Sequence, residues 1–203
     1  IRFPVGEPSG RNVLEVKDLS FAYDDLPIFS NFNTHVQRGD KVAIIGRNGI
    51  GKTTLIHQLL AAVERPDHPQ VSWGHNASVG VMSQHHGDEI EAGSTVFEWL
   101  FQFKAGADQE SVRAILGRML FSGADGKKPT GTLSGGERAR LMLCKLILLE
   151  HNALVLDEPT NHLDLAQAGL VLEVARELAD RGLGVLAVLH DLSLAGAHAD
   201  VLT

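Results

Sequence analysis

Residues 46–53 are the feature that most constrains the fold of this chain. They read G-R-N-G-I-G-K-T and match G-x-x-x-x-G-K-[ST], a glycine-rich loop whose backbone N–H groups surround a phosphate. An apolar run, K-V-A-I-I-G, precedes the loop at 41–46, and apolar residues at helical spacing follow Lys52. This order predicts a buried parallel strand, the loop, and a helix whose N-terminus faces the phosphate. We therefore expect an α/β fold that holds a nucleoside triphosphate.

The residue types of the loop fit separate tasks. Glycines let the backbone turn and bring its N–H groups close to a polyanion. Lys52 is expected to reach the β- and γ-phosphates, and the Thr53 hydroxyl is expected to ligate Mg²⁺. A chance glycine-rich turn before a helix is the alternative, and the complete order of strand, loop, Lys-Thr and helix disfavours it. The expected cofactor-binding residues of this unit are Gly46, Asn48, Gly49, Gly51, Lys52, Thr53 and Thr54.

Two adjacent carboxylates follow a second apolar run. Residues 153–156 are apolar, and Asp157 and Glu158 come at the C-terminal end of the run, where open α/β sheets place their ligands. Asp157 fits the acid on the Mg²⁺ side of phosphate-loop enzymes, and Glu158 fits the residue that polarises the attacking water. Adjacent acids at a strand end are often only a solvated turn. The preceding apolar run and the phosphate loop favour the catalytic interpretation.

The sequence L-S-G-G-E at 133–137 predicts a second anion site. Gly135 and Gly136 expose backbone amides directly before a helix expected over 137–149, and Ser134 is placed to cap that helix. One domain needs only one site for a γ-phosphate, so the second would serve the nucleotide of a neighbouring domain. An ordinary capped helix explains the same residues, and the physics of the pattern does not decide between the two.

Together these motifs resemble those of the ATP-binding cassette (ABC) superfamily over nearly the whole chain. Residues 46–53 resemble its Walker A motif, 133–137 its signature motif and 154–157 its Walker B motif. The resemblance implies an α/β phosphate-loop fold with a mainly parallel core sheet, an antiparallel β subdomain and an inserted helical subdomain. It also implies ATP and Mg²⁺ as cofactors, a second cassette as a head-to-tail partner, and ATP hydrolysis at their interface.

The resemblance extends to four further positions. Gln84, after V-G-V-M-S, is similar to the Q-loop glutamine that senses Mg²⁺ and the attacking water. N-H-L-D at 161–164 resembles the D-loop, which crosses the dimer interface. His190, after V-L-A-V-L, resembles the switch histidine that contacts the γ-phosphate, and Tyr23 lies where the family stacks an aromatic ring on adenine.

By this resemblance the site residues fall into groups. The catalytic residues would be Glu158, His190 and Gln84, and the Mg²⁺ site would involve Thr53, Gln84 and Asp157. The nucleotide of this chain would contact Tyr23 and the phosphate loop. The nucleotide of the partner cassette would contact Ser134, Gly135 and Gly136.

Up to residue 165 the chain is most similar to the second cassette of ABC-F proteins, which are tandem-cassette ATPases that act on ribosomes. The similarity is carried by the stretch 133–165, by V-S-W-G-H-N at 71–76 and by S-T-V-F-E-W-L at 94–100. A ribosome-associated ATPase is therefore one expected function.

From 166 to 203 the chain is more similar to the cassettes of haem and metal-chelate importers. Leu189 precedes the switch histidine, where ABC-F proteins usually carry a serine. The motor subunit of an importer, bound to a membrane permease, is therefore the alternative function. A further hypothesis is a recombined or engineered chimera that joins the two kinds of cassette near residue 165.

The pattern along the chain predicts four segments. Residues 1–12 form a lead-in, 13–93 the antiparallel subdomain and the first part of the core, 94–130 the helical subdomain, and 131–203 the signature helix and the second part of the core. Cassettes usually continue beyond the strand expected at the end of this sequence, so the domain is expected to be truncated.

Two helices are expected inside the helical segment. Thr95 and Glu98 have the spacing of a capping box at the first, and the second is expected over 108–121. No long coiled-coil heptads interrupt the chain, which disfavours a DNA-repair ATPase with the same signature.

Composition restricts the partners. The 203 residues carry a formal net charge of −7, which argues against direct nucleic-acid binding by this domain alone. No apolar run approaches the roughly 20 residues that span a bilayer, and residues 1–12 lack the apolar core of a signal peptide. The single Cys144 lies among apolar residues, and one cysteine excludes an internal disulfide. A cytoplasmic protein is expected, peripheral at the inner membrane in the importer alternative.

Overall fold

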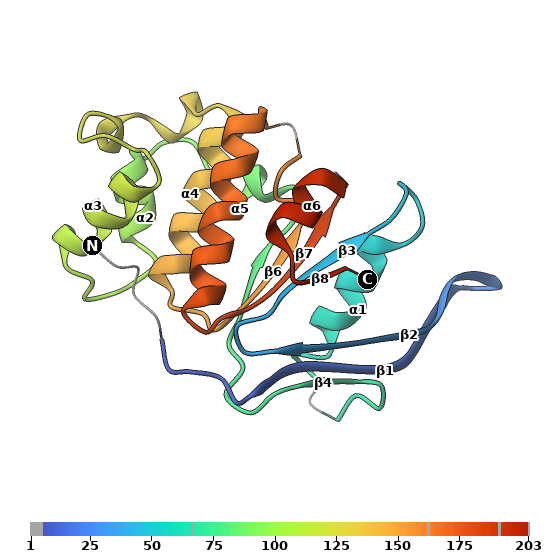
Figure 1. Ribbon diagram of the computed structural model, residues 1–203. Coiled ribbons are helices and arrows are strands. Elements are labelled where there is room, and N and C mark those ends of the chain that lie inside the picture. The colour runs from blue at the N-terminus through green and yellow to red at the C-terminus, as the bar shows by residue number, and fades with distance from the viewer. Residues whose placement is uncertain (1–5, 66, 162, 191, 203) are drawn as a thin grey trace.

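The chain folds around two β-sheets of different kinds (Figure 1). This computed structural model describes residues 6–65, 67–161, 163–190 and 192–202. The strands and sheets given below belong to these residues. The first five residues of the expected lead-in lie outside this part of the chain. His162 of the D-loop stretch and Asp191 after the switch histidine also lie outside it.

The larger sheet is parallel throughout the described pairings. Its strand order is β5-β6-β7-β3-β8, so the strand before the phosphate loop is flanked on both sides. Its strands are β5 (Val79–Met82), β6 (Ala153–Asp157), β7 (Gly184–Leu189), β3 (Lys41–Ile45) and β8 (Val201–Leu202). The carboxyl ends of β3, β5, β6 and β7 lead directly into the loops that carry the motifs, as expected for a parallel sheet.

The smaller sheet is antiparallel and is built on a long hairpin. β1 (Asn12–Tyr23) pairs with β2 (Leu26–Gln37) on one side and with β4 (Val71–Trp73) on the other. The antiparallel β subdomain expected at the start of the chain is therefore confirmed. The third strand, which follows the phosphate-loop helix in sequence, joins this sheet instead of the parallel one.

Side chains that alternate between the two faces of the parallel sheet belong to two separate hydrophobic cores. In β6, Leu154 and Leu156 face one core, whereas Ala153 and Val155 face the other. Helices α4 (Gly135–Leu148) and α5 (Leu165–Asp180) pack on the first face. Helix α1 (Lys52–Ala61) and the antiparallel sheet cover the second (Figure 1). The central sheet is thus buried on both faces, which explains its continuous apolar runs.

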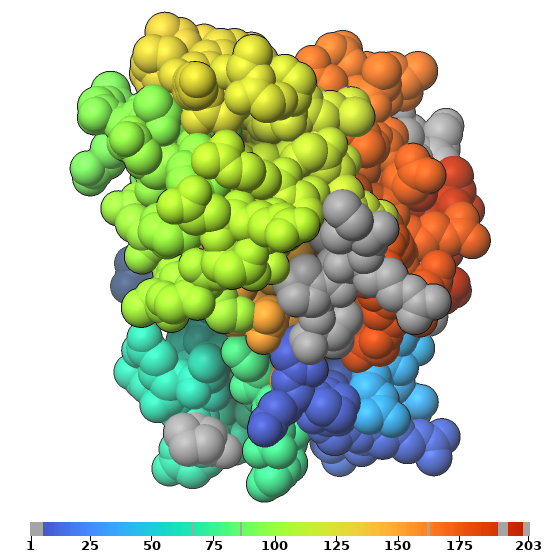
Figure 2. Space-filling view, turned by 90° about the vertical axis from the view of Figure 1, so that its left-hand side faces the viewer, coloured from blue at the N-terminus to red at the C-terminus, as the bar shows by residue number. Residues whose placement is uncertain are grey.

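The segment between the two halves of the core is mainly helical. It contains α2 (Val96–Phe101) and α3 (Gln109–Arg118), and Thr95 forms the expected capping box with Glu98. α3 ends earlier than expected, because Leu120 takes a left-handed φ of 60° and the Phe121 amide bonds back to the Leu116 carbonyl. In Figure 2 the yellow-green residues of this segment lie above the blue and teal residues of the N-terminal third.

Short helical turns and one last helix complete the described elements. They are the 3₁₀ turns η1 (His86–Glu89), η2 (Asp125–Lys127) and η3 (Thr130–Thr132), and the helix α6 (Leu192–His198). α4 begins at Gly135, two residues before the expected start, with Ser134 as its cap, and Cys144 on this helix is fully buried. Among the described helices, none is both long and apolar enough to cross a membrane.

Candidate functional site

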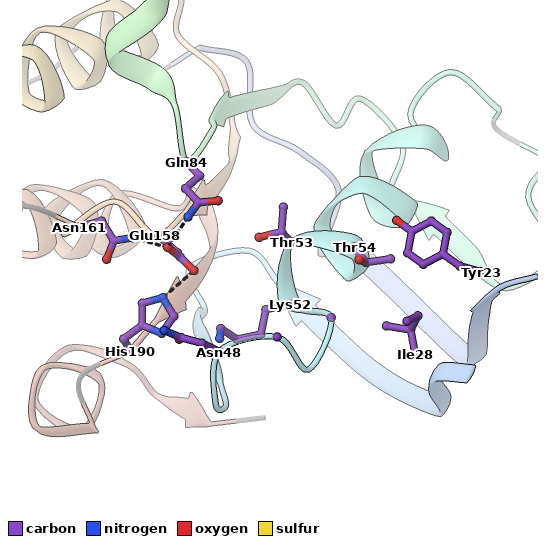
Figure 3. Close-up of a pocket in the computed structure, with 12 residues that line it drawn as sticks. Tyr23, Ile28, Asn48, Lys52, Thr53, Thr54, Gln84, Glu158, Asn161 and His190 are labelled. Carbon is purple, nitrogen blue, oxygen red and sulfur yellow. Dashed lines mark hydrogen bonds and ion pairs between the residues drawn. The ribbon is translucent and has the colours of Figure 1, made fainter. Parts of the chain in front are cut away.

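A pocket of about 720 Å³ lies where the carboxyl ends of β3, β5, β6 and β7 approach the β1–β2 hairpin (Figure 3). Ten of the residues that line it belong to the set expected from the sequence. They are Tyr23, Asn48, Gly49, Gly51, Lys52, Thr53, Thr54, Gln84, Glu158 and His190. Residues from both ends of the sequence thus share one cavity.

The phosphate loop has a backbone that only glycine adopts without strain at two positions. Gly49 and Gly51 have φ of 82° and 100°, and a Cβ at Gly51 would overlap the Ile28 side chain. Lys52 is buried and its Nζ donates to the carbonyl oxygens of Gly46 at 2.9 Å and Arg47 at 3.1 Å. An ammonium group is therefore fixed inside the loop, at the N-terminus of α1.

Glu158 lies at one end of the pocket, and three side chains bind its carboxylate (Figure 3). The Gln84 Nε2 donates to Oε2 at 2.9 Å, the Asn161 Nδ2 donates to the same oxygen, and the His190 Nε2 lies 2.5 Å from Oε1. Glu158 also has a left-handed φ of 53°, which is a strained conformation for a residue with a Cβ. The fold therefore directs this buried carboxylate into the cavity at a conformational cost.

Asp157 has different surroundings from its neighbour. It is 3% exposed, and its Oδ1 has no hydrogen-bond partner within the described chain. Burial raises the pKa of this carboxyl above its ordinary value, a hydrogen bond from Thr53 lowers it, and the Glu158 charge raises it. A buried carboxylate oxygen without a donor, beside a threonine hydroxyl, is a donor set that suits a hard cation such as Mg²⁺. In Figure 3 the Gln84 side-chain oxygen faces the side of the pocket where Thr53 lies.

The opposite end of the pocket is formed by the hairpin. Tyr23 is 54% exposed, and its ring meets Phe21 edge to face with centroids 4.9 Å apart. Ile28 lies close to it on the pocket wall (Figure 3). The cavity thus has an aromatic and aliphatic end, a glycine-rich middle and a carboxylate end.

Two lining residues, Ile28 and Asn161, are missing from the set of binding residues expected from the sequence. Phe21 pairs with Phe29 and Ala22 with Pro27, so Ile28 is the extra residue of a β-bulge that turns it into the pocket. Such a bulge leaves no clear signal in the sequence. Asn161 belongs to the stretch expected to form the D-loop, and its place three residues after Glu158 is the signal that could have identified it.

Five expected residues do not line this cavity. Gly46 and Asp157 lie just behind its wall, as the Lys52 and Thr53 contacts above require. Ser134, Gly135 and Gly136 are instead at the start of α4. The Ser134 Oγ accepts from the Glu137 amide at 3.3 Å, Gly135 has open space where a Cβ would be, and Gly136 abuts the Gln167 amide. The amides of this turn are therefore not part of the same pocket.

Comparison with known proteins identifies relatives of one kind. The model of the family described as ABC transporter matches residues 29–161. The chain is 46% identical over 166 residues to the protein YbiT of Escherichia coli O157:H7, covering 81% of this chain and 31% of that protein. It is 36% identical over 192 residues to ABC transporter F family member 5 of Arabidopsis thaliana, covering 94% of this chain and 27% of that protein. The chain spans less than a third of the length of each of these relatives.

A solved structure has the same fold. The cbiO1 protein of Clostridium perfringens, part of the ABC transporter complex cbiONQ, matches with a TM-score of 0.78 at 21% identity, over 95% of this chain and 84% of that chain. The Arabidopsis alignment covers 94% of the chain, so it continues well past residue 165. A chimera is therefore not needed to explain residues 166–203, and that hypothesis is unconfirmed.

Proposed function

Because the chain belongs to the ABC transporter family, we propose that it binds Mg-ATP and hydrolyses it at the interface of a head-to-tail pair of cassettes. The observation that carries this proposal is the graded pocket of Figure 3. An aromatic ring and an isoleucine at one end suit a purine base. The glycine loop with Lys52 suits the phosphates, and the Glu158 cluster suits the end where the γ-phosphate is attacked.

The nucleotide-binding roles follow from these positions. Tyr23 and Ile28 would stack on and pack against adenine, because both line the hairpin end of the pocket. Lys52 would exchange its two carbonyl partners for β- and γ-phosphate oxygens, and the exposed amides of the loop and of the α1 N-terminus would bind the same group.

The catalytic roles rest on the carboxylate pair. Thr53 and Asp157 would hold Mg²⁺, with Gln84 next to them, and the ion would neutralise charge that develops on the phosphates. Glu158 would orient and polarise the attacking water, and His190 would contact the γ-phosphate. Glu158 would have to release at least one of its present donors before it could accept a hydrogen bond from water.

The head-to-tail pairing explains the second set of amides. Ser134, Gly135 and Gly136 lie outside the pocket of their own chain, at the N-terminus of a helix of 14 residues. A helix N-terminus with open amides attracts anions. In the proposed dimer these residues would bind the γ-phosphate of the nucleotide held by the partner.

The process that ATP drives would be that of an ABC-F protein on the ribosome, in the cytoplasm. The 36% identity to ABC transporter F family member 5 supports this subfamily. The importer-like stretch after residue 165 favours the alternative, a motor subunit bound to a membrane permease. Cosedimentation of the chain with ribosomes, against detergent-extracted membranes, separates the two. Recovery with the membranes alone would contradict the ABC-F assignment.

The binding step can be tested with Lys52→Ala. Removing the ammonium group should weaken Mg-ATP binding roughly 10- to 100-fold, because charge-assisted contacts to phosphate are the strongest polar contacts in such a site. Isothermal titration calorimetry measures the change. Lys17→Ala is the matched control, since Lys17 pairs with Glu15 on the surface and is absent from the pocket lining. Equal affinity of the Lys52 and Lys17 variants would show that the phosphate loop is misassigned.

A further inference from the structure

We propose that Lys128 is a positioning residue for the signature turn, where it neutralises Glu137 so that the N-terminus of α4 can accept the partner's γ-phosphate. The inference rests on the proposed function, and it adds a residue and an electrostatic role that the motifs do not contain. Its basis is the ion pair between Lys128 and Glu137, which is placed at the expected anion site.

The turn carries its own negative charge. Glu137 is the third residue of α4 and completes a capping box, in which its Oε2 accepts from the Ser134 amide at 2.8 Å. Burial favours the neutral acid, but hydrogen bonds from Lys128 and Ser134 outweigh it and hold the pKa of Glu137 below its usual value. The carboxylate is therefore ionised beside the amides of Gly135 and Gly136.

This charge has opposite effects on the helix and on a ligand. A carboxylate in the first turn stabilises the helix, because it complements the positive end of the helix dipole. The same carboxylate repels an incoming triphosphate, which carries several negative charges. A capping box that ends in glutamate is thus favourable for folding and unfavourable for anion binding, unless a cation accompanies it.

Lys128 supplies that cation. Its Nζ lies 2.7 Å from Oε1 and 2.9 Å from Oε2 of Glu137, so it contacts both carboxylate oxygens. Its position is set from outside α4. The Lys128 carbonyl accepts from the Val96 amide at 3.0 Å, and its amide donates to the Asp125 carbonyl at 3.0 Å. The helical segment therefore fixes the Lys128 backbone within reach of the turn.

Apart from Lys128 and Glu137, one positive and one negative side chain lie next to the first turn of α4. The Arg138 guanidinium donates to the carbonyl oxygens of Gly87 and Ile90, so it adds a positive charge to the first turn of α4. Asp164 binds the Gln167 amide that abuts Gly136, so it adds a negative one. With Lys128 present, the Glu137 charge is offset as well. Without Lys128, the turn would carry one uncompensated negative charge.

The experiment measures self-association of the full chain by sedimentation, in Mg²⁺ and a non-hydrolysable ATP analogue. Lys128→Met should weaken the dimer roughly fivefold for each of its two sites, the size of a typical charge effect at a helix N-terminus. The double variant Lys128→Met/Glu137→Gln should return to near the parent value, because glutamine keeps the capping box and removes the uncompensated charge. Lys128→Arg should behave as the parent.

Two further variants separate charge from structure. Lys104→Met is the matched control, because Lys104 pairs with Glu150 at 2.6 Å beyond the other end of α4, about 20 Å away along a helix of this length. It makes the same change in net charge and should leave the dimer unaffected. Lys128→Gln keeps amide donors for Glu137 and should weaken the dimer even if Lys128→Met folds poorly. The melting temperature of each variant shows whether the substitution has also destabilised the fold.

Three outcomes would overturn the proposal. The dimer of the double variant could remain as weak as that of Lys128→Met, which would show that Lys128 has a structural role and not an electrostatic one. Lys104→Met could weaken the dimer equally, which would make the effect one of net charge alone. The parent could bind the analogue without associating at all. That third result belongs to the proposed function, since it appears before any variant is made, and the role of Lys128 would fall with it.

Discussion

At the scale of single residues, the two adjacent carboxylates are placed in opposite environments. Asp157 keeps a buried oxygen without a donor among the described residues, whereas both oxygens of Glu158 are occupied by side-chain donors. A cation would satisfy the free oxygen of Asp157, whereas each oxygen of Glu158 already has a side-chain partner. The contrast suits a metal ligand next to a residue that must be released before it acts on water.

The buried Asp157 should destabilise the nucleotide-free fold at neutral pH. Its folded-state pKa is raised above 3.8, so its protonated form is favoured by folding, and stability is lost as pH rises through the folded-state value. Asp157→Asn should therefore stabilise the chain by about 1 kcal/mol at pH 7.5 without nucleotide, and by less near pH 5. Urea unfolding at the two pH values measures the difference.

The same substitution should weaken Mg²⁺-dependent ATP binding, because it removes an anionic ligand. Asp67→Asn, at an exposed position, is the control and should change neither quantity. If Asp157→Asn is less stable than the parent across this pH range, the buried oxygen has a partner that the side-chain contacts do not include.

Glu158→Gln should stop hydrolysis and preserve ATP binding. Glutamine has nearly the same shape but cannot accept a proton from water, so turnover should fall at least about 100-fold. It should also favour the closed dimer, because bound ATP persists. Phosphate release and calorimetry measure the two effects, and Glu150→Gln, whose side chain pairs with Lys104, is the control. Turnover equal to that of the parent would show that Glu158, although next to Asp157, has no catalytic function.

At the scale of elements, the sequence predicts best what local spacing determines. β3, the phosphate loop and α1 are contiguous, and both capping boxes join residues three positions apart, Thr95 with Glu98 and Ser134 with Glu137. Each of these depends on backbone geometry within one turn of chain. The caps and the side chains that each loop presents were therefore predictable, although α4 begins two residues before its expected start.

What the sequence does not predict is pairing between distant segments. β4 is too short to show a period, and nothing in Val71–Trp73 indicates that it would pair with β1 instead of joining the parallel sheet. The bulge that turns Ile28 into the pocket depends on the register between β1 and β2. The grouping of Gln84, Asn161 and His190 on Glu158 likewise requires the order β5-β6-β7, which the residue pattern of a single strand does not indicate.

At the scale of the whole molecule, the two proposed anion sites of one chain are separate. The pocket lies between the carboxyl ends of β3, β5, β6 and β7 and the hairpin, whereas the signature turn begins α4 and lines none of it. Such an arrangement would be self-complementary in the proposed dimer. Two copies related by a twofold axis would each complete the other's site, so the active unit would be a pair.

Ser134→Arg tests this pairing directly. A long side chain at the cap of α4 should fill the amide cradle and block closure, while binding of ATP to the single chain should stay close to normal, because Ser134 is absent from its pocket. Hydrolysis should collapse. Ser134→Ala is the control, since it removes only the cap and should cost about 1 kcal/mol of stability.

Mixing Ser134→Arg with Glu158→Gln gives the decisive result. In a mixed dimer, one site receives the glutamine substitution from one chain and the arginine substitution from the other, so both lesions fall together and the second site is intact. Equal amounts should therefore recover some activity, at most roughly a quarter of the parent value, which is the limit when half of the dimers are mixed and each has one working site. Steady-state phosphate release at increasing ratios of the two variants measures the recovery. If Ser134→Arg weakens ATP binding by the single chain as much as Lys52→Ala does, the signature turn serves its own nucleotide and the head-to-tail arrangement is wrong.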